Sequence, residues 1–515
     1  MNNWIVLPLL IPLCAAVVLV LLKENIAMQR LISAIAAVPN IAAACLLVCQ
    51  VRTGGIQTLR MGGWIPPYGI VFVADMFAAL LVFTTAVVGA ACLVYSFRSI
   101  GRRREKHYFY PFFHFLLAGV TGSFLTGDLF NLFVCFEVML IASYALIVLG
   151  GTRRQLRETL KYILINIVSS TLFVTAIAYL YSVAGTLNIA HLSVRIAEAG
   201  QGGIVNVIAV LFLIVFSLKA GLFLFFWLPG SYGAPPAAVT ALFGALLTKV
   251  GLYALIRVFT LIFYHDPNMT HRWIGWMAAA TMILGGLGAV AYTDIRRILN
   301  YNVIVSVGFI AFGLAVAAKD SLQGVVFYLL HDMVAKALVF FLGGMIAARA
   351  GTDDVKEMGG LIGRYPLLGW MFFVTALAMV GVPPLSRFPG KALMIRGGLG
   401  EGFYWFSAVA LLSSLIVLYS MMNIFMHAFW GREKSGPAKR RRSGQWMQHA
   451  ALGLFVVMLL FGIGADWAYS FVAQAGEGLA HPEHYIESVL KGEGQNGIAT
   501  VAEPLHRFHM DVSAQ

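Results

Sequence analysis

The feature that most constrains the fold is a series of about fourteen long apolar stretches along nearly the whole chain. Each is about 20 residues long, the length that an α-helix needs to cross the hydrocarbon core of a bilayer. Of the 515 residues, 60% are hydrophobic and 11% are charged, whereas about 25% of residues are charged in soluble domains. The sequence therefore predicts an all-α polytopic membrane protein with about fourteen transmembrane helices.

The loops between these stretches carry an orientation signal. The predicted spans are centred near Leu13, Ala42, Thr84, Leu117, Met139, Leu172, Val215, Thr248, Ile283, Phe309, Leu338, Ala378, Leu415 and Met458. Basic residues follow odd-numbered spans, at Arg98, Arg102, Arg103, Arg104 and Lys106, at Arg153, Arg154 and Arg157, at Arg296 and Arg297, at Arg349, Lys356 and Arg364, and at Lys439, Arg440, Arg441 and Arg442. Since basic loops stay in the cytoplasm, we expect a bacterial inner-membrane protein with both termini outside. The net charge of +13 then reflects these loops and predicts no nucleic-acid partner.

The two ends of the chain differ in character. The first stretch, from Trp4 to Leu22, lacks a basic leader and an Ala-x-Ala exit, so we interpret it as a retained helix and not as a cleaved signal. The tail from about Val472 holds several glutamates and no apolar span. We expect this tail to be a poorly ordered or partner-docking extension.

Nothing in the sequence predicts a cofactor. The five cysteines all lie in apolar stretches and form no CxxC or iron–sulfur run: Cys14, Cys45, Cys49, Cys92 and Cys135. There is no Walker A loop, and no GxGxxG segment follows a strand. We therefore expect no cofactor, no metal centre and no enzyme active site.

Four charged residues lie in stretches where lipid disfavours them. Glu137 lies in span 5, Lys219 in span 7, Lys249 in span 8, and Lys391 at the end of the interrupted span 12. A charge near the bilayer centre costs about 2.5–3.5 kcal/mol on insertion scales. Such residues persist where they face protein or water, are paired, or are neutral. Four of them, of both signs, predict a path along which protons or cations move.

Glu137 and Lys219 form the first candidate pair. Lys219 has about ten or more apolar residues before it and the run LFLFFWLP after it, which argues against a lysine that reaches the membrane surface. In apolar surroundings a lysine can hold and release a proton near neutral pH as a nearby charge moves. The alternative is a static structural pair, and the two interpretations differ in whether the pairing must break.

Spans 8 and 11 supply further titratable groups. Lys249 lies in mid-span beside Thr248. His331 titrates near neutrality and suits a relay, although a lone membrane histidine often serves only as a hydrogen bonder between helices. Asp332 and Lys336 are four residues apart and can pair on one helix face.

Other polar residues receive structural interpretations. We interpret Ser169, Ser170 and Thr171 as side chains that hydrogen-bond to their own helix or to a neighbour. Asp75, near the start of span 3, is expected to be interfacial. Asp294, before Arg296 and Arg297, is expected to form a solvated ion pair in a loop.

The middle of the chain carries a weak internal repeat. Seven identities recur at a constant offset of 166, from Tyr162, Leu164, Val168, Leu172, Ala184, Gly185 and Thr186 to Tyr328, Leu330, Val334, Leu338, Ala350, Gly351 and Thr352. Spans 6 and 11 are then equivalent, and copies five spans apart are inverted across the membrane, as in many transporters. We expect a three-helix segment at 1–108, inverted repeats at 109–265 (spans 4–8) and 266–432 (spans 9–13), and a basic loop, span 14 and outward-facing tail at 433–515.

Spans 7 and 12 are predicted to be broken helices. Span 12 holds Pro383, Pro384, Pro389 and Gly390, while Pro229-Gly230 end span 7 and Pro235-Pro236 open span 8. Proline removes a backbone donor and clashes with the preceding turn. In a membrane the freed carbonyls are tolerated only where protein or water satisfies them. Each break lies near an intramembrane lysine, Lys219 or Lys391.

Ordered motifs run through about residues 70–430. The matching positions are Lys219, Trp227-Leu228-Pro229, Ala234-Pro235, Leu246 to Lys249 with Tyr253 and Arg257, Glu137 in span 5, Lys336 to Phe340, and Pro383 to Lys391. Together these motifs resemble the antiporter-like membrane subunits of respiratory complex I, of membrane hydrogenases and of Mrp-type multisubunit cation/proton antiporters.

The chain departs from that family pattern in several places. Phe225-Phe226 and Gly230-Ser231-Tyr232 stand where complex I homologues often have histidines. Asp332 takes the place of a histidine four before the lysine, and Arg387 that of a usual glycine. Lys391 stands where some complex I subunits carry glutamate, and only about 44 residues follow span 14, too few for a long lateral helix. These features are most similar to the D-type subunits of Mrp antiporters.

This resemblance implies fourteen helices, broken helices 7 and 12, and secondary antiport of external H⁺ for cytoplasmic Na⁺. The implied translocation residues are Glu137 and Lys219 as a gating pair, Lys249 as a lateral relay, His331 and Lys336 as its continuation, and Lys391 as its end. The implied partners are the lipid bilayer, the transported ions Na⁺ and H⁺, and other subunits of A, B, C, E, F and G type.

Two alternatives remain open. The chain can instead be a proton-pumping membrane subunit of a complex I-like NADH:quinone oxidoreductase or membrane hydrogenase, which would co-purify with iron–sulfur or flavin subunits. It can also be a structural or assembly subunit whose buried charges only pair. These alternatives predict different co-purifying proteins and different effects of replacing Glu137 and Lys219.

Overall fold

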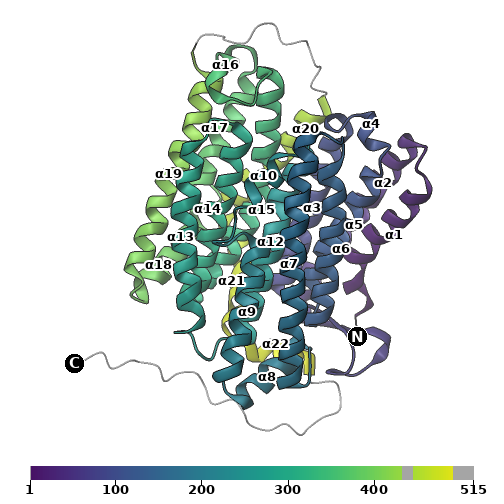
Figure 1. The fold of residues 1–515 in the computed structure, drawn as a ribbon, viewed down its shortest axis with the longest axis vertical. Helices are drawn as coiled ribbons and strands as arrows, with labels where there is room; N and C mark the ends of the chain where they lie inside the picture. Colours follow the sequence, from purple (N-terminus) through teal and green to yellow (C-terminus); the bar gives the residue numbers. More distant parts are fainter. Residues whose placement is uncertain (1, 432–444, 491–515) are drawn as a thin grey trace.

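The computed structural model describes residues 2–431 and 445–490, which form an almost entirely helical bundle (Figure 1). Twelve helices in this part of the chain are long and apolar enough to cross a membrane. Two shorter apolar helices, Phe109–Leu125 and Pro366–Val380, correspond to predicted spans 4 and 12. The prediction of an all-α polytopic membrane protein is therefore confirmed.

The elements follow one another along the chain in this order. They are η1 (Asn3–Val6), α1 (Leu7–Leu21), α2 (Ile26–Gly54), β1 (Gln57–Arg60), η2 (Met61–Gly63), β2 (Val71–Ala74), α3 (Met76–Ser99), α4 (Arg102–Glu105), α5 (Phe109–Leu125), α6 (Leu129–Val148), α7 (Arg153–Ala184), α8 (Ile189–Ala199), α9 (Gly203–Ala220), α10 (Leu228–Gly233), α11 (Ala237–Leu242), η3 (Phe243–Leu247), α12 (Thr248–Leu261), α13 (Thr270–Ala291), α14 (Ile295–Val316), α15 (Lys319–Ala350), η4 (Val355–Glu357), α16 (Leu361–Arg364), α17 (Pro366–Val380), α18 (Phe388–Gly400), α19 (Tyr404–Phe429), α20 (Gln445–Ile463), α21 (Ala465–Ala480) and α22 (Pro482–Leu490).

The centre of the bundle is α15, with α12 and α14 beside it. The apolar stretches of α15 and of the segment from α11 to α12 are completely buried, whereas those of α1 and α2 are mostly exposed. α15 contacts α3, α11, α14, α17, α18, α20 and α21. A helix that is apolar on all sides gains most from such an interior position. Lys249 and Arg257 of α12 and Asp332 and Lys336 of α15 are therefore held where lipid and bulk water do not reach.

The internal repeat appears as two matching backbone pairings. Leu129 N donates to Leu187 O, and Ile189 N donates to Gly127 O, both at 2.9 Å. The residues 166 positions later form the same pair, with Ile295 N donating to Asp353 O and Val355 N to Thr293 O, again at 2.9 Å. The first pairing lies near α8 and the second near α16, at opposite ends of the bundle (Figure 1). This arrangement is that of an inverted repeat.

Both predicted helix breaks are present. Span 7 is interrupted between α9 and α10, and span 12 between α17 and α18. Each first half ends alike: Gly221 and Leu222 donate to Ser217 O, and Gly381 and Val382 donate to Leu377 O. Gly221 and Gly381 have φ values of 75° and 91°, in the left-handed region that glycine adopts most readily. The breaks therefore follow from glycine caps as well as from the prolines.

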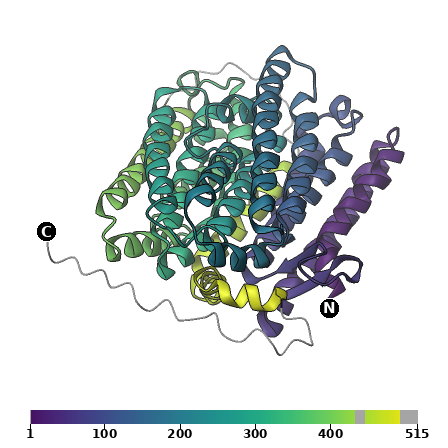
Figure 2. The ribbon, with the colours of Figure 1, turned by 60° about the horizontal axis from the view of Figure 1, so that its bottom comes forward.

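The C-terminal segment differs from the expectation. Up to Leu490 it is ordered into α21 and α22, so the predicted poorly ordered extension is wrong for this part; residues 491–515 lie outside the described part. α21 is attached at two points, since Tyr469 donates to Gln323 Oε1 at 2.8 Å and Arg52 donates to Gln474 Oε1 at 3.0 Å. Figure 2 shows α22 running across the end of the bundle near the β1–β2 hairpin. The glutamates in this segment made it look too polar to pack, but α21 and α22 each bury an apolar face against the rest of the protein.

A surface ion pair also holds α21. Lys319, at the start of α15, pairs with Glu477. The hydrogen bond from Lys319 holds the pKa of Glu477 below its usual value. The carboxylate therefore keeps its charge as the pH falls into the ordinary glutamate range, and this contact is lost only below it.

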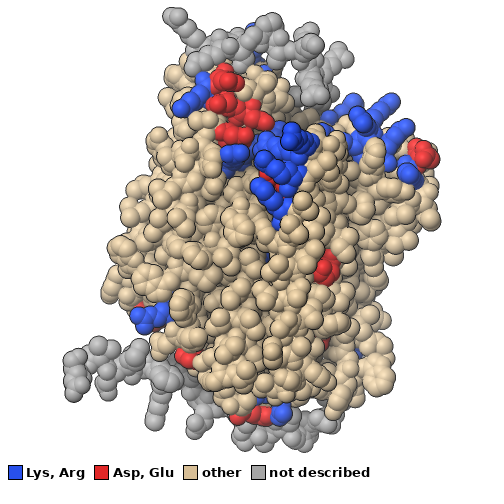
Figure 3. All heavy atoms as spheres, viewed as in Figure 1, with Lys and Arg blue, Asp and Glu red and all other residues tan. Residues whose placement is uncertain are grey.

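Basic side chains gather at one end of the molecule. Figure 3 shows Lys and Arg concentrated at the end that carries α4 and α16, above a broad surface of uncharged residues. Asn2 and α22 lie at the other end (Figure 1). The predicted cluster of Lys439, Arg440, Arg441 and Arg442 lies outside the described residues. The asymmetry of the described loops agrees with the orientation signal in the sequence.

We expect substitution of Gly119 by Val to destabilise the bundle. A Cβ atom at Gly119 of α5 would lie 2.7 Å from Met139 N and 2.9 Å from Cys135 O, both backbone atoms of α6. Overpacking of this kind costs about 1–3 kcal/mol, so the melting temperature in detergent should fall by several degrees. Gly453→Val on α20 is the matched control, because a Cβ there meets nothing within 4 Å. Equal melting temperatures of the two variants would contradict the close packing of α5 on α6.

Candidate ion-translocation site

The intramembrane charges lie on helices that pack in sequence across the bundle. α6 contacts α7, α7 contacts α9, α9 contacts α12, and η3, which precedes α12, contacts α15. α15 then contacts α18, and α18 contacts α19. Each of the six predicted translocation residues lies on one of these helices. The fold therefore brings residues far apart in the sequence into one series.

The first group in the series joins Glu137 to Lys219 through a serine. Ser170 of α7 donates a hydrogen bond to Glu137 Oε1, and Lys219 Nζ donates to Ser170 Oγ at 3.4 Å. In the described part of the chain no direct ion pair joins Glu137 to Lys219. The sequence interpretation of Ser170 as a packing residue missed this bridge, because a serine in a membrane helix carries no signal of its own.

The surroundings of the two charged groups differ. Lys219 is 5% exposed and lies in the last turn of α9, with its Nζ 4.9 Å from the centre of the Phe136 ring. The negative end of the α9 dipole and the ring face both favour a cation there. Glu137 is partly exposed on the side of the bundle. The series therefore reaches the lateral surface at Glu137.

Lys249 follows an unusual turn of helix. Residues 243–247 form the π-helical segment η3, and Lys249 Nζ donates to Gly244 O at 2.9 Å. π-Helical turns leave backbone carbonyls free and often occur at functional sites. No residue pattern in the sequence predicted this turn. The π-helical turn places the carbonyl of Gly244 beside the amine of Lys249, which has no exposed surface.

Asp332 is the central anion of the site. Its Oδ2 lies 2.7 Å from Lys249 Nζ, and its Oδ1 lies 2.9 Å from an Arg387 nitrogen and 3.8 Å from Lys336 Nζ. All four side chains are at most 1% exposed. The pairing of Asp332 with Lys336 was predicted from their spacing and is present. The contacts with Lys249 and Arg387 come from other helices and were not predicted.

Neighbouring groups complete the centre of the series. Lys336 Nζ also donates to Asn302 O at 2.8 Å. His331 Nδ1 lies 2.6 Å from Ser386 Oγ, in the break of span 12, and Nε2 has no hydrogen-bond partner among the described residues. His331 therefore contacts the broken helix and not Lys336.

Lys391 lies at the far end of the series. Its Nζ donates to Val380 O at 2.7 Å and to Ser414 Oγ at 2.5 Å, and lies 4.9 Å from the centre of the Phe309 ring. Val380 is the last residue of α17, so the lysine meets the negative end of that half-helix. Lys391 is partly exposed, as Glu137 is. Both ends of the series thus reach the lateral surface while its middle is sealed.

A second buried ion pair lies outside this series. Arg257 binds both carboxylate oxygens of Asp75 at 2.7 Å, and its Nε lies 3.3 Å from Tyr253 Oη. Tyr253 in turn donates to Phe124 O at 2.7 Å. Asp75 caps the start of α3, where it was expected, but it is buried inside the bundle and paired with Arg257. We interpret this pair as a tie between α3 and α12.

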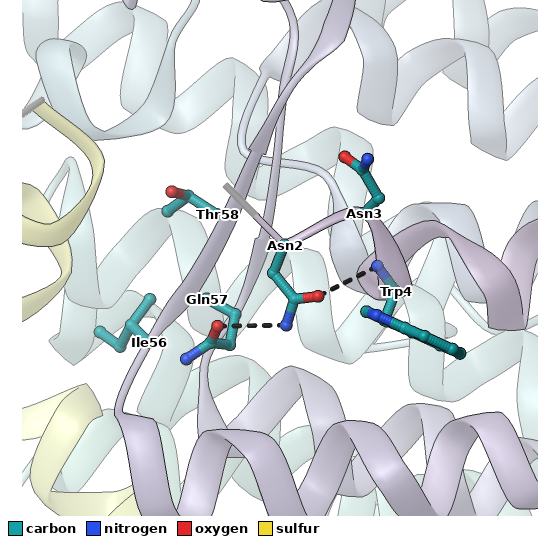
Figure 4. Close-up of a pocket in the computed structure, with 6 residues that line it drawn as sticks. All are labelled: Asn2, Asn3, Trp4, Ile56, Gln57 and Thr58. Atoms are coloured by element: carbon teal, nitrogen blue, oxygen red, sulfur yellow. Dashed lines mark hydrogen bonds between the residues drawn. The ribbon is translucent and has the colours of Figure 1, made fainter.

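A pocket near the N-terminus holds none of the translocation residues. It is open, has a volume of about 540 Å³, and is lined by Asn2, Asn3, Trp4, Ile56, Gln57 and Thr58 (Figure 4). Asn2 Nδ2 donates to Gln57 Oε1 at 3.2 Å, and Trp4 N donates to Asn2 Oδ1 at 3.0 Å. None of its lining side chains titrates, so it offers no group that could hold a proton.

Comparison with known proteins gives close matches over the whole described fold. The family described as "NADH:quinone oxidoreductase/Mrp antiporter, TM" matches residues 126–428. The Na(+)/H(+) antiporter D subunit of Bacillus subtilis is 54% identical over 492 residues, which cover 95% of this chain and 100% of the relative. The protein of the same name from Alkalihalophilus pseudofirmus is 48% identical over 493 residues, with coverage of 95% and 100%.

Solved structures give the same picture. A chain of the Mrp complex from Dietzia sp. has a TM-score of 0.89 at 30% identity, and a chain of the membrane-bound sulfane sulfur reductase, an archaeal respiratory membrane complex, has 0.87 at 26%. Each comparison covers 95% of this chain and 100% of the other. A chain of respiratory complex I from Thermus thermophilus shares the fold, with a TM-score of 0.80 at 22% identity.

We expect Arg257→Met to lower the melting temperature in detergent. Removing one partner of a buried pair costs about 3–5 kcal/mol, because the other charge is left uncompensated. The double variant Asp75→Leu with Arg257→Met should recover much of the loss. Arg396→Met is the matched control, because Arg396 is 78% exposed in its pair with Asp320 and such pairs contribute less than about 1 kcal/mol. If the double variant is no more stable than Arg257→Met alone, the interpretation that this ion pair holds α3 against α12 is contradicted.

Proposed function

Because the chain belongs to the NADH:quinone oxidoreductase/Mrp antiporter family of membrane subunits, we propose that it is the transport subunit of a multisubunit cation/proton antiporter that exchanges external H⁺ for cytoplasmic Na⁺. The observation that carries this proposal is the series of titratable groups from Glu137 to Lys391, which is buried in its middle and partly exposed at its ends. The names of the relatives from Bacillus subtilis and Alkalihalophilus pseudofirmus support sodium as the cation.

The relay has three parts. Glu137 and Lys219 form the gate, with Ser170 between them. Lys249, in the first repeat, relays the proton laterally towards Asp332, which it contacts. His331 and Lys336 continue the path, and Lys391 ends it. Each protonation change moves a charge in a medium of low dielectric, so it changes the energy of the next site strongly.

Other subunits cover the two lateral ends of the series. An exposed carboxylate at mid-membrane is costly in lipid, and Glu137 is partly exposed on the side of the bundle. Lys391 is partly exposed at the far end. Neighbouring subunits of A, B, C, E, F and G type would remove both groups from lipid. Mass spectrometry of the complex purified in mild detergent identifies them, and iron–sulfur or flavin subunits would instead favour the redox alternative.

The location and organisation follow from the same features. The chain is a multi-pass membrane protein, and the basic end would face the cytoplasm of a bacterial inner membrane. Both termini would then lie outside, since Asn2 and α22 lie at the opposite end (Figure 1). Residues 109–265 and 266–432 would be the two functional repeats, with 1–108 and 433–515 flanking them.

Replacement of either gate residue should abolish exchange. We expect Glu137→Ala and Lys219→Ala complexes to assemble but to lose at least about tenfold in Na⁺-dependent proton movement, because the gate loses one of its two charges. The measurement is dye-monitored proton movement in everted vesicles, with assembly checked by co-purification. Normal exchange by both assembled variants would defeat the mechanism and favour the structural-subunit alternative.

The serine bridge gives a second test of the gate. Ser170→Ala should slow exchange by about tenfold, because the hydrogen-bonded link from Lys219 to Glu137 is interrupted. Ser170→Thr keeps a hydroxyl and should restore most of the rate. Ser169→Ala is the matched control, since Ser169 Oγ donates to the backbone, at Val215 O, at 3.4 Å. Equal rates for Ser170→Ala and Ser169→Ala would show that the bridge carries no proton.

A further inference from the structure

Arg387 is the least expected charge in the molecule. It is 1% exposed and lies in the break of span 12, directly before α18. Arginine keeps its proton at any pH that a protein experiences. A permanent positive charge is therefore fixed in the centre of the transport path, beside groups that have to gain and lose protons.

The surrounding contacts hold the Arg387 guanidinium in one place. It donates to Met379 O of α17, to Ser306 Oγ of α14 at 2.8 Å, and to Tyr328 Oη of α15. It also donates to Asp332 Oδ1 at 2.9 Å, and its Cζ lies 4.1 Å from the centre of the Tyr328 ring. Contacts with three helices leave the side chain no freedom to follow a moving proton. Arg387 is thus a static partner of Asp332.

The charges around Asp332 do not balance if every lysine is protonated. Arg387, Lys249 and Lys336 face one carboxylate, and no other acidic side chain pairs with any of them in the described part of the chain. Two excess positive charges in a sealed, low-dielectric site are strongly unfavourable. Since Arg387 retains its proton, at most one of the two lysines carries a proton in the resting site.

Asp332 and Arg387 are charges of opposite sign that touch each other here. Their side chains meet at 2.9 Å across two helices. The arginine alone would be an uncompensated buried charge, and the aspartate alone would hold both lysines protonated. Together, Asp332 and Arg387 add no net charge. Lys249 and Lys336 are then left with one proton between them.

Resting on the proposed function, we propose that Arg387 is a fixed counter-ion that makes Lys249 and Lys336 share one proton across Asp332. Arg387 neutralises part of the charge of the Asp332 carboxylate. The part that is left attracts whichever of the two lysines is protonated. The proton leaves Lys249 Nζ, on the first repeat, and ends on Lys336 Nζ, on the second. Asp332 is a carboxylate at the start and at the end of this step. Arg387 is thus a positioning residue for transfer between the repeats.

The test compares variants that change the charge of Arg387 with one that keeps it. Arg387→Gln leaves Asp332 to hold both lysines protonated, so Na⁺-dependent proton movement in everted vesicles should fall at least about tenfold. Arg387→Lys supplies a cation that, unlike arginine, can lose its proton when it is buried. It should therefore restore exchange most at the acidic end of the pH profile, where that lysine is charged. An Arg387→Lys rate no higher than the Arg387→Gln rate at every pH would overturn the proposal.

A double variant separates this role from a purely structural one. Asp332→Asn with Arg387→Gln removes both charges, so the complex should assemble with a parental melting temperature even if Arg387→Gln alone does not. Exchange should still be lost, because no carboxylate remains between the two lysines. Parental exchange by the assembled double variant would overturn the proposal. Lys219→Ala is run alongside: if it exchanges ions normally, the proposed function itself fails, and not only the role of Arg387.

Discussion

The interior of this protein depends on the Asp332 carboxylate, which meets three cations in a space closed to lipid and bulk water. Contacts of 2.7 Å to Lys249, 2.9 Å to Arg387 and 3.8 Å to Lys336 tie together α12, the break of span 12 and α15. On a protein surface such contacts contribute little. Inside a membrane, a charge left unpaired costs several kcal/mol. The same cluster therefore holds these three parts of the bundle together.

The broken helices and the buried cations stabilise each other. Each first half of a broken span ends with carbonyls that no further turn can satisfy. Lys391 donates to Val380 O and Arg387 to Met379 O at the end of α17, while Lys219 lies in the last turn of α9. The negative end of each half-helix offsets part of the cost of burying a cation. An unbroken helix in either place would offer no such carbonyls.

Much of this organisation could be predicted because it depends on local patterns. Apolar length predicted the fourteen spans, proline and glycine predicted the breaks, and a four-residue spacing predicted the contact of Asp332 with Lys336. Ser170, Arg387 and Asp75 were not recognised as partners of charged groups, because each partner lies on another helix. Asp75 and Arg257 are separated by 182 residues in the sequence, for example. No residue pattern in the sequence predicted the π-helical turn before Lys249 or the packing of α21.

By itself, the sequence determined that the chain crosses the membrane many times, where its helices break, and which charges lie too deep for lipid. These properties follow from hydrophobic length and backbone chemistry, which act over a few turns of one helix. Only the tertiary structure decided which charges meet, that a serine stands between Glu137 and Lys219, and that one carboxylate serves three cations. The reason is physical: a buried charge is stabilised by whatever group packing brings within about 4 Å of it, and that group is rarely near in the chain.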